Sequence, residues 1–108
     1  MRRVYCTGYS NGGRFCSRLA SELSDRIAAI APVSGLRYPT RNNATRPMPL
    51  LAFHGDSDWV NPWDGHGATY WALSIQEVAL KWAAFNGCSY ANQDLRASIR
   101  GCLGLDIA

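Results

Sequence analysis

The sequence predicts an α/β fold in which a parallel sheet of three to four strands is connected by crossover helices. Two observations support this prediction. Short apolar runs alternate along the 108 residues with segments of helical periodicity, which is typical of parallel strands joined by helices. One run, residues 27–33, is apolar throughout and rich in small side chains, as expected for a strand that packs on both faces.

The first half of the chain is predicted to form a strand, a helix and a second strand. Residues 3–7 are short and rich in β-formers, and Gly8 follows them. Residues 27–33 form the second strand, and 34–48, rich in Gly, Pro, Arg and Asn, form a loop. Between the strands, a helix ending at Ser24-Asp25 presents an apolar face made of Phe15, Cys16, Leu19, Ala20 and Leu23.

The second half is predicted to add a strand, a long loop and a helix. Residues 50–53 form a short apolar strand, and 54–73 form an ordered surface loop. Ser74 and Glu77 have the spacing of a capping box, and Asn86-Gly87 supplies a left-handed helix end. Residues 103–107 could begin another strand. The buried stripe of the helix consists of Ile75, Val78, Ala79, Trp82 and Ala83.

Composition argues against several classes of function. The net charge is +3, and the arginines are well separated, so the sequence does not indicate nucleic-acid binding. No apolar run approaches the roughly 18 to 20 residues that span a bilayer. No cysteine or histidine spacing is typical of a zinc site, so we expect no metal and no membrane contact. Four cysteines and the sequon Asn43-Ala44-Thr45 are compatible with a secreted protein.

The segment Gly8-Tyr9-Ser10-Asn11-Gly12 is the clearest chemical signal. It has the form G-x-S-x-G and lies between a predicted strand and a predicted helix, the context of a nucleophile elbow. So tight a turn requires that the flanking positions lack side chains. It would lift the Ser10 hydroxyl above the sheet edge and place the Asn11 amide where it can donate to an oxyanion. The alternative is a glycine-rich turn with a solvated serine.

An acidic loop directly follows the third strand. Asp56 and Asp58 both lie on it, and the chain order serine then aspartate is the one that such hydrolases use. Either carboxylate could reach towards Ser10 through a histidine. The alternative is that both are turn residues, because aspartate favours such loops.

These segments together resemble the feruloyl esterase and polyhydroxybutyrate depolymerase family, whose members are secreted α/β-hydrolases. The resemblance implies cleavage of carboxylic esters by a Ser-Asp-His triad without any cofactor. It assigns Ser10 as the nucleophile, Asn11 as one oxyanion amide and Asp58 as the triad acid. The matching segments are Arg3-Val4-Tyr5 through Gly13, Arg26 through Gly35, Phe53-His54-Gly55 through Asp58, Pro62-Trp63-Asp64-Gly65 and Trp82 through Cys88.

The sequence departs from the family pattern at both ends. We expect residues 1–108 to be the central to C-terminal part of one catalytic domain, lacking the early strands and the end that bears the histidine. The order Ser10, Asp58, His66 is formally correct for a triad, but His66 precedes the helix that normally comes before the base. His54, at a strand end, is expected to pack or to bond the loop backbone.

Two further groups of residues keep alternative interpretations. The resemblance suggests that Cys88 and Cys102 pair, whereas Cys6 and Cys16 could equally be buried free thiols. The aromatic residues near Asp58 could hold the long loop onto the domain or form a wall for an aromatic acyl group or sugar ring. They are Trp59, Trp63, Tyr70 and Trp71.

The resulting functional hypothesis is a serine carboxylesterase of feruloyl-esterase type that acts on ester-linked plant cell-wall polysaccharide. Its expected partner is a feruloylated polysaccharide or a related ester. A polyhydroxybutyrate depolymerase or short-chain esterase would use the same machinery, and a catalytically inactive fragment is the alternative from another class.

Overall fold

The computed structural model describes residues 3–88 and 103–107. Within these residues one sheet contains four parallel strands in the order β1-β2-β3-β4. The predicted α/β class with a parallel sheet and crossover helices is confirmed, including the strand at 103–107. The strands are β1 (Tyr5–Tyr9), β2 (Ala29–Val33), β3 (Leu50–His54) and β4 (Leu103–Ile107), and the helices are α1 (Asn11–Glu22), α2 (Ile75–Asn86) and the short 3-10 helix η1 (Thr69–Trp71).

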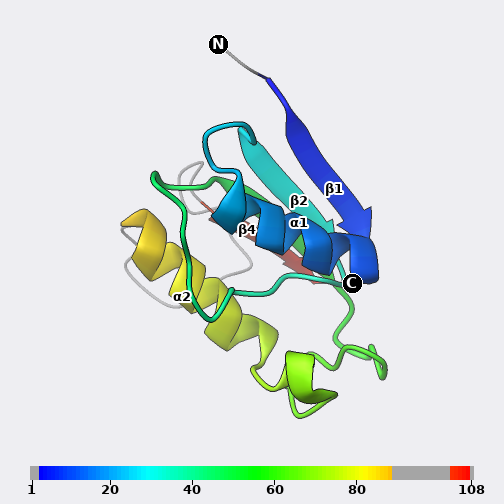
Figure 1. Ribbon diagram of the computed structural model, residues 1–108. Coiled ribbons are helices and arrows are strands. Elements are labelled where there is room, and N and C mark those ends of the chain that lie inside the picture. The colour runs from blue at the N-terminus through cyan, green and yellow to red at the C-terminus, as the bar shows by residue number, and fades with distance from the viewer. Residues whose placement is uncertain (1–2, 89–102, 108) are drawn as a thin grey trace.

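Both long helices lie on one face of the sheet (Figure 1). This follows from the topology, because neighbouring parallel strands taken in sequence order and joined by right-handed crossovers place every connection on the same side. The other face is open within the described residues, and Tyr5 and Tyr9 are 65% and 73% exposed there. Residues 29, 31 and 33 are only half-buried. The prediction that this strand packs on both faces is therefore wrong for the described part of the chain.

The buried side of α1 differs from the predicted one. Cys16 and Ala20 are buried as expected, but Phe15 is 61% exposed and Leu23 is 38% exposed. Serines replace them on the buried side, because α1 packs so closely on the sheet that only small side chains fit. Ser17 Oγ, for example, donates to the Gly35 carbonyl at 3.2 Å. The buried residues of α1 are Gly13, Cys16, Ser17, Ala20 and Ser21.

Helix α2 agrees with its prediction in full. Ser74 Oγ accepts from the Glu77 N–H, the Glu77 carboxylate accepts from the Ser74 N–H, and both bonds of the capping box are present. At the other end Gly87 adopts a left-handed conformation with φ of 69°. The predicted stripe is buried, with each of its five side chains at most 1% exposed: Ile75, Val78, Ala79, Trp82 and Ala83.

A disulfide joins β1 to α1. Cys6 and Cys16 are bonded to each other, so the alternative of two free thiols is wrong. Cys88 is also disulfide-bonded, and Cys102, its expected partner, lies outside the described residues. Among the helices that the structure describes, none combines the length and apolarity needed to cross a membrane.

Candidate active site

Ser10 occupies the sharp turn between β1 and α1. Its backbone has φ of 55° and ψ of −110°, a combination that side-chain-bearing residues rarely adopt. The conformation is held from the neighbouring strand, because the Ser10 N–H donates to the Val33 carbonyl at 2.8 Å. Ser10 is half-buried, so the turn holds it in place without enclosing it. This is the geometry that the nucleophile-elbow prediction requires.

Close backbone contacts around the turn explain its glycines. A Cβ on Gly8 would lie 2.5 Å from the Gly12 carbonyl carbon, and a Cβ on Gly35 would lie 2.6 Å from the Ser10 carbonyl oxygen. A Cβ on Gly12, in contrast, would meet nothing within 4 Å. The prediction that both flanking positions must lack side chains therefore holds for Gly8 and is wrong for Gly12. The backbone of Gly12 is instead the group against which Gly8 packs.

The start of α1 lies directly beside the Ser10 hydroxyl. Asn11 is the first residue of the helix, and its side chain is exposed. The first N–H groups of a helix have no intrahelical acceptor and carry the positive end of the helix dipole. The Asn11 N–H follows Ser10 directly and belongs to the first turn of the helix, so it is available to donate to a negative charge beside Ser10.

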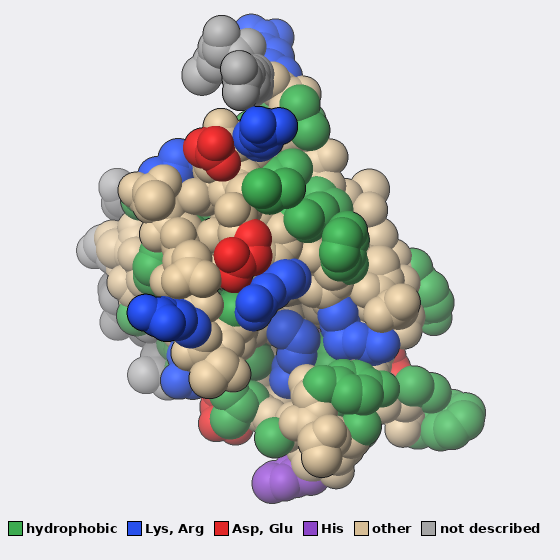
Figure 2. Space-filling model, viewed as in Figure 1, with side chains coloured by type: hydrophobic (Ala, Val, Ile, Leu, Met, Phe, Trp, Pro, Cys, Tyr) green, Lys and Arg blue, Asp and Glu red, His purple; other side chains and the backbone are tan. Residues whose placement is uncertain are grey.

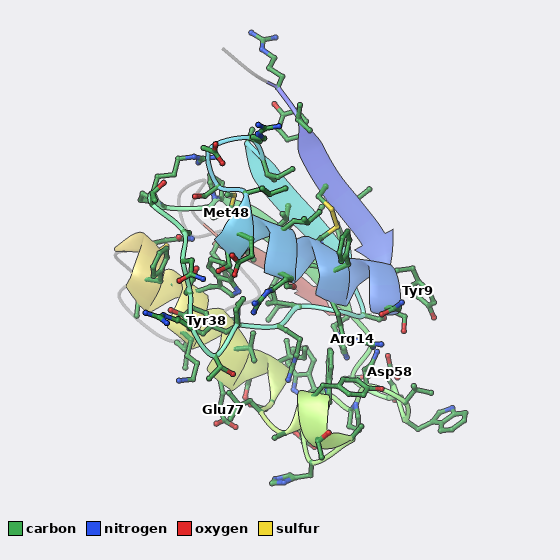
Figure 3. All side chains as sticks on the ribbon, viewed as in Figure 1. Tyr9, Arg14, Tyr38, Met48, Asp58 and Glu77 are labelled. Carbon is green, nitrogen blue, oxygen red and sulfur yellow. A yellow bond between two sulfur atoms is a disulfide. The ribbon has the colours of Figure 1, made fainter. Side chains whose placement is uncertain are left out.

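Asp58 lies on the loop that follows β3, at the same edge of the sheet as Ser10, because the strands are parallel and both residues follow carboxyl ends. Arg14 and Asp58 both lie near the N-terminal end of α1 (Figure 3). Asp58 Oδ1 accepts from the Val60 and Asn61 N–H groups at 2.9 Å each, which fixes the carboxylate. Asp58 Oδ2 accepts no hydrogen bond from any described residue. Asp56 is exposed, and among the described residues its side chain accepts a hydrogen bond only from its neighbour Ser57.

Asn61 connects the two candidate catalytic residues. It is 1% exposed, and its side-chain amide donates to the Ser34 carbonyl at 2.9 Å and lies 3.4 Å from Ser10 Oγ. Its own N–H donates to Asp58, so one residue contacts both the serine and the acid. The sequence analysis missed this residue, because an asparagine in a loop normally indicates a turn. Nothing in the sequence predicts that it is buried.

His54 is held in a structural role, as expected. Its Nε2 lies 2.8 Å from the Asn61 carbonyl oxygen, which requires Nε2 to carry the proton and donate. The ring stacks on Trp71 with centroids 5.6 Å apart, and the side chain is 1% exposed. Burial lowers the pKa of His54, a shift that the Asn61 carbonyl and the Asp58 charge partly oppose. Its Nε2 also lies 3.9 Å from Asp58 Oδ2, beyond hydrogen-bond distance, so His54 is held by the loop backbone and resists protonation.

The lowered pKa of His54 predicts a pH dependence of stability. The unfolded chain binds a proton at His54 as pH falls below about 6.5, while the folded protein resists that protonation. The free energy of unfolding is therefore expected to fall as the pH is lowered through and below that value. The variant His54→Gln has an amide that keeps a donor but does not titrate. Chemical denaturation between pH 7 and pH 5 should show that its free energy of unfolding changes less with pH than that of the wild type. Equal slopes in the two proteins would contradict this assignment.

The second histidine, His66, lies on the surface of the loop. His66 is exposed with φ of 60°, and its N–H donates to the Ala72 carbonyl. No contact of its side chain with Ser10 or Asp58 is present among the described residues.

Trp71 is fully buried and its Nε1 donates to the Pro62 carbonyl at 2.7 Å, so it holds the loop onto the domain. Trp63 is half-buried, and Trp59 and Tyr70 are 87% and 53% exposed, so these two rings are the most accessible to a ligand.

Comparison with known proteins shows that the chain is similar to parts of several esterases. The chain is 41% identical over 59 residues to a bifunctional acetylxylan esterase/xylanase of Neocallimastix patriciarum, covering 55% of this chain and 9% of that protein. It is 28% identical over 99 residues to feruloyl esterase B of Piromyces equi, covering 82% and 18%. A protein of Aspergillus flavus named probable feruloyl esterase C is 34% identical over 87 residues, covering 81% and 29%. No protein-family model matches the chain.

Proposed function

Because the chain is a distant, partial homologue of feruloyl and acetylxylan esterases, we propose that it carries the nucleophile and the acid of a serine carboxylesterase of feruloyl-esterase type. The observation that supports this most directly is the backbone of Ser10, whose φ of 55° places the residue in a strained turn between a strand and a helix. The chain spans between 9% and 29% of the length of the three relatives described above. The esterase activity of the whole protein that contains this chain is therefore also a proposal.

In the proposed reaction Ser10 Oγ attacks the ester carbonyl carbon, and a histidine takes the hydroxyl proton. The tetrahedral intermediate carries a negative oxygen, towards which the Asn11 N–H donates. The intermediate collapses, and the alcohol leaves with the proton that the histidine returns. Water then attacks the acyl group on Ser10 by the same route, which releases the carboxylic acid and restores the serine.

Asp58 is proposed to orient that histidine. Its Oδ1 is occupied by the two backbone N–H groups, so Oδ2 is the atom that can accept from an imidazole N–H. The charge of the carboxylate would stabilise the imidazolium that forms when Ser10 loses its proton. Neither His54, which donates to the Asn61 carbonyl, nor the exposed His66 fits this role. We propose that the general base lies beyond these 108 residues in the same catalytic domain.

The substrate and the compartment belong to the same proposal. The names of two relatives refer to feruloyl esters and of another to acetylxylan, which supports an ester of a plant cell-wall polysaccharide as the substrate. The Cys6–Cys16 disulfide supports a secreted protein, since such bonds form and persist in oxidising compartments.

The acidic loop offers a matched pair of variants that tests the proposal. Asp58→Asn is expected to lower kcat for methyl ferulate hydrolysis by about 10⁴-fold, because the histidine would lose its orienting carboxylate. Asp56→Asn removes the same charge from an exposed neighbour two residues away and should leave kcat within about twofold. Equal effects of the two substitutions would contradict the assignment of Asp58.

The same assay identifies the ester. Methyl ferulate, a chromogenic acetate ester and a hydroxybutyrate oligomer should be compared with the full protein, and methyl ferulate is expected to have the highest kcat/KM. Preference for the oligomer would instead indicate a polyhydroxybutyrate depolymerase, and preference for the acetate ester a short-chain esterase. Absence of turnover with all three would contradict an esterase of any kind.

A further inference from the structure

A cavity of about 460 Å³ lies beside the candidate active site, between α1, the loop that follows β2 and η1. Three arginines line it, and the space-filling view shows basic side chains gathered in the middle of this face (Figure 2). Arg14 belongs to the first helical turn after Ser10, and its N–H donates to the Ser10 carbonyl at 2.9 Å. The cavity therefore adjoins the candidate site through one shared residue.

Two of these arginines have no ion-pair partner. Within the described residues no carboxylate forms an ion pair with Arg14 or Arg37, whereas Arg18 pairs with Glu22 at 3.3 Å. Arg14 instead makes long bonds of 3.4 Å to the neutral side-chain oxygens of Asn11 and Asn61. Arg37 donates to two backbone carbonyls and stacks on Trp71 at 3.5 Å. Burial and the charge of Arg14 lower the pKa of Arg37 to about 10, and the Glu77 carboxylate opposes this shift only in part.

The remaining lining favours a hydroxylated ligand with a flat face. Thr40 and Thr69 present hydroxyls at exposed positions, and Tyr38 and Tyr70 add aromatic rings. Arg14 already lies 4.5 Å from the centroid of the Tyr70 ring, so a cation and an aromatic surface meet at the cavity wall. Sugar rings stack on aromatic side chains and hydrogen-bond to hydroxyls, while a carboxylate pairs with guanidinium groups.

We propose that this cavity binds a carboxylate-bearing sugar, a hexuronic acid, whose charge neutralises Arg14 and Arg37. The proposal deepens the proposed function, on which it rests for the source of the ligand: an acidic branch of the polysaccharide that carries the ester. Binding at the cavity is separable from ester cleavage. A protein that binds the sugar acid without hydrolysing any ester would refute the proposed function and leave the cavity assignment intact.

The test is an NMR titration of the full protein with sodium glucuronate, glucose and sodium sulfate at constant ionic strength. Glucuronate should bind at least tenfold more tightly than either of the others, and its amide shifts should centre on Ser17, Thr40 and Thr69. The variant Arg37→Gln removes one guanidinium group and should weaken glucuronate binding about tenfold or more. Arg18→Gln, at an exposed position, should weaken it about threefold without affecting folding.

A control variant removes the same charge elsewhere. Arg26→Gln changes an exposed arginine outside the cavity and should leave the glucuronate affinity unchanged. Equal affinity for glucuronate and glucose would overturn the role of the arginines, and equal affinity for sulfate would overturn the role of the sugar ring. An unchanged affinity in Arg18→Gln together with shifts away from the cavity would overturn the site itself. Ester hydrolysis is measured separately with methyl ferulate, because glucuronate contains no ester bond that Ser10 could cleave.

Discussion

Replacing Ser10 with glycine is expected to abolish ester hydrolysis and to make the protein more stable. Loss of the nucleophile should lower kcat by about 10⁶-fold, as for other triad serines. The gain in stability arises because Ser10 has φ of 55° and ψ of −110°, a conformation that costs roughly 1–3 kcal/mol for a residue with a Cβ. Glycine adopts it freely but loses more entropy on folding, so we expect a net gain of about 1 kcal/mol in the free energy of unfolding.

The variant Ser10→Ala separates the two effects. Alanine also lacks the hydroxyl, so its kcat should fall as far, but it keeps the Cβ and therefore the strain. Chemical denaturation should place Ser10→Ala close to the wild type and Ser10→Gly above both. If alanine and glycine stabilise the protein equally, the strain does not come from the backbone, and if Ser10→Ala keeps activity, Ser10 is not the nucleophile.

Replacing Gly8 with alanine is expected to be strongly destabilising. The new Cβ would lie 2.5 Å from the Gly12 carbonyl carbon, and the clash involves backbone that cannot rotate away. Relief requires β1 to move from the start of α1, which also displaces Ser10. We expect a loss of about 3 kcal/mol in the free energy of unfolding and, where the protein still folds, about a hundredfold loss in kcat/KM.

Gly12→Ala is the matched control for that change. It adds the same methyl group on the other side of the same contact, where nothing lies within 4 Å. Because Gly12 is inside α1, alanine should stabilise the protein by about 0.5–1 kcal/mol. Thermal unfolding of both variants measures the difference. Destabilisation of similar size in the two variants would show that the contact does not control the turn.

The strand and helix pattern could be predicted from the sequence, because apolar periodicity and helix ends are local properties. Ser74, Glu77 and Gly87 define α2 from its own residues, and the structure confirms both ends. The buried side of α1 could not be predicted in the same way. Its close approach to the sheet depends on contacts such as that of Ser17 with Gly35, which are 18 residues apart in the sequence. Apolarity alone therefore assigned Phe15 to the wrong side.

The candidate site shows the same division. The motif around Ser10 and the acid at Asp58 are visible in the sequence, and the parallel sheet brings their strand ends to one edge. Asn61 is not visible, because its importance arises from burial between the Ser34 carbonyl, Ser10 and Asp58. The pairing of Cys6 with Cys16 also depends on the fold, since cysteine spacing alone leaves the bonding partners open.

The bond between Cys6 and Cys16 encloses the whole turn that bears Ser10. The bonded residues are ten positions apart in the sequence, and chain-entropy theory attributes about 3 kcal/mol to this crosslink. That amount is comparable to the conformational cost of the turn itself. A thiol reductant that opens this bond would therefore loosen the turn that bears Ser10. Maturation of this segment is coupled to oxidation, so recombinant production calls for an oxidising compartment.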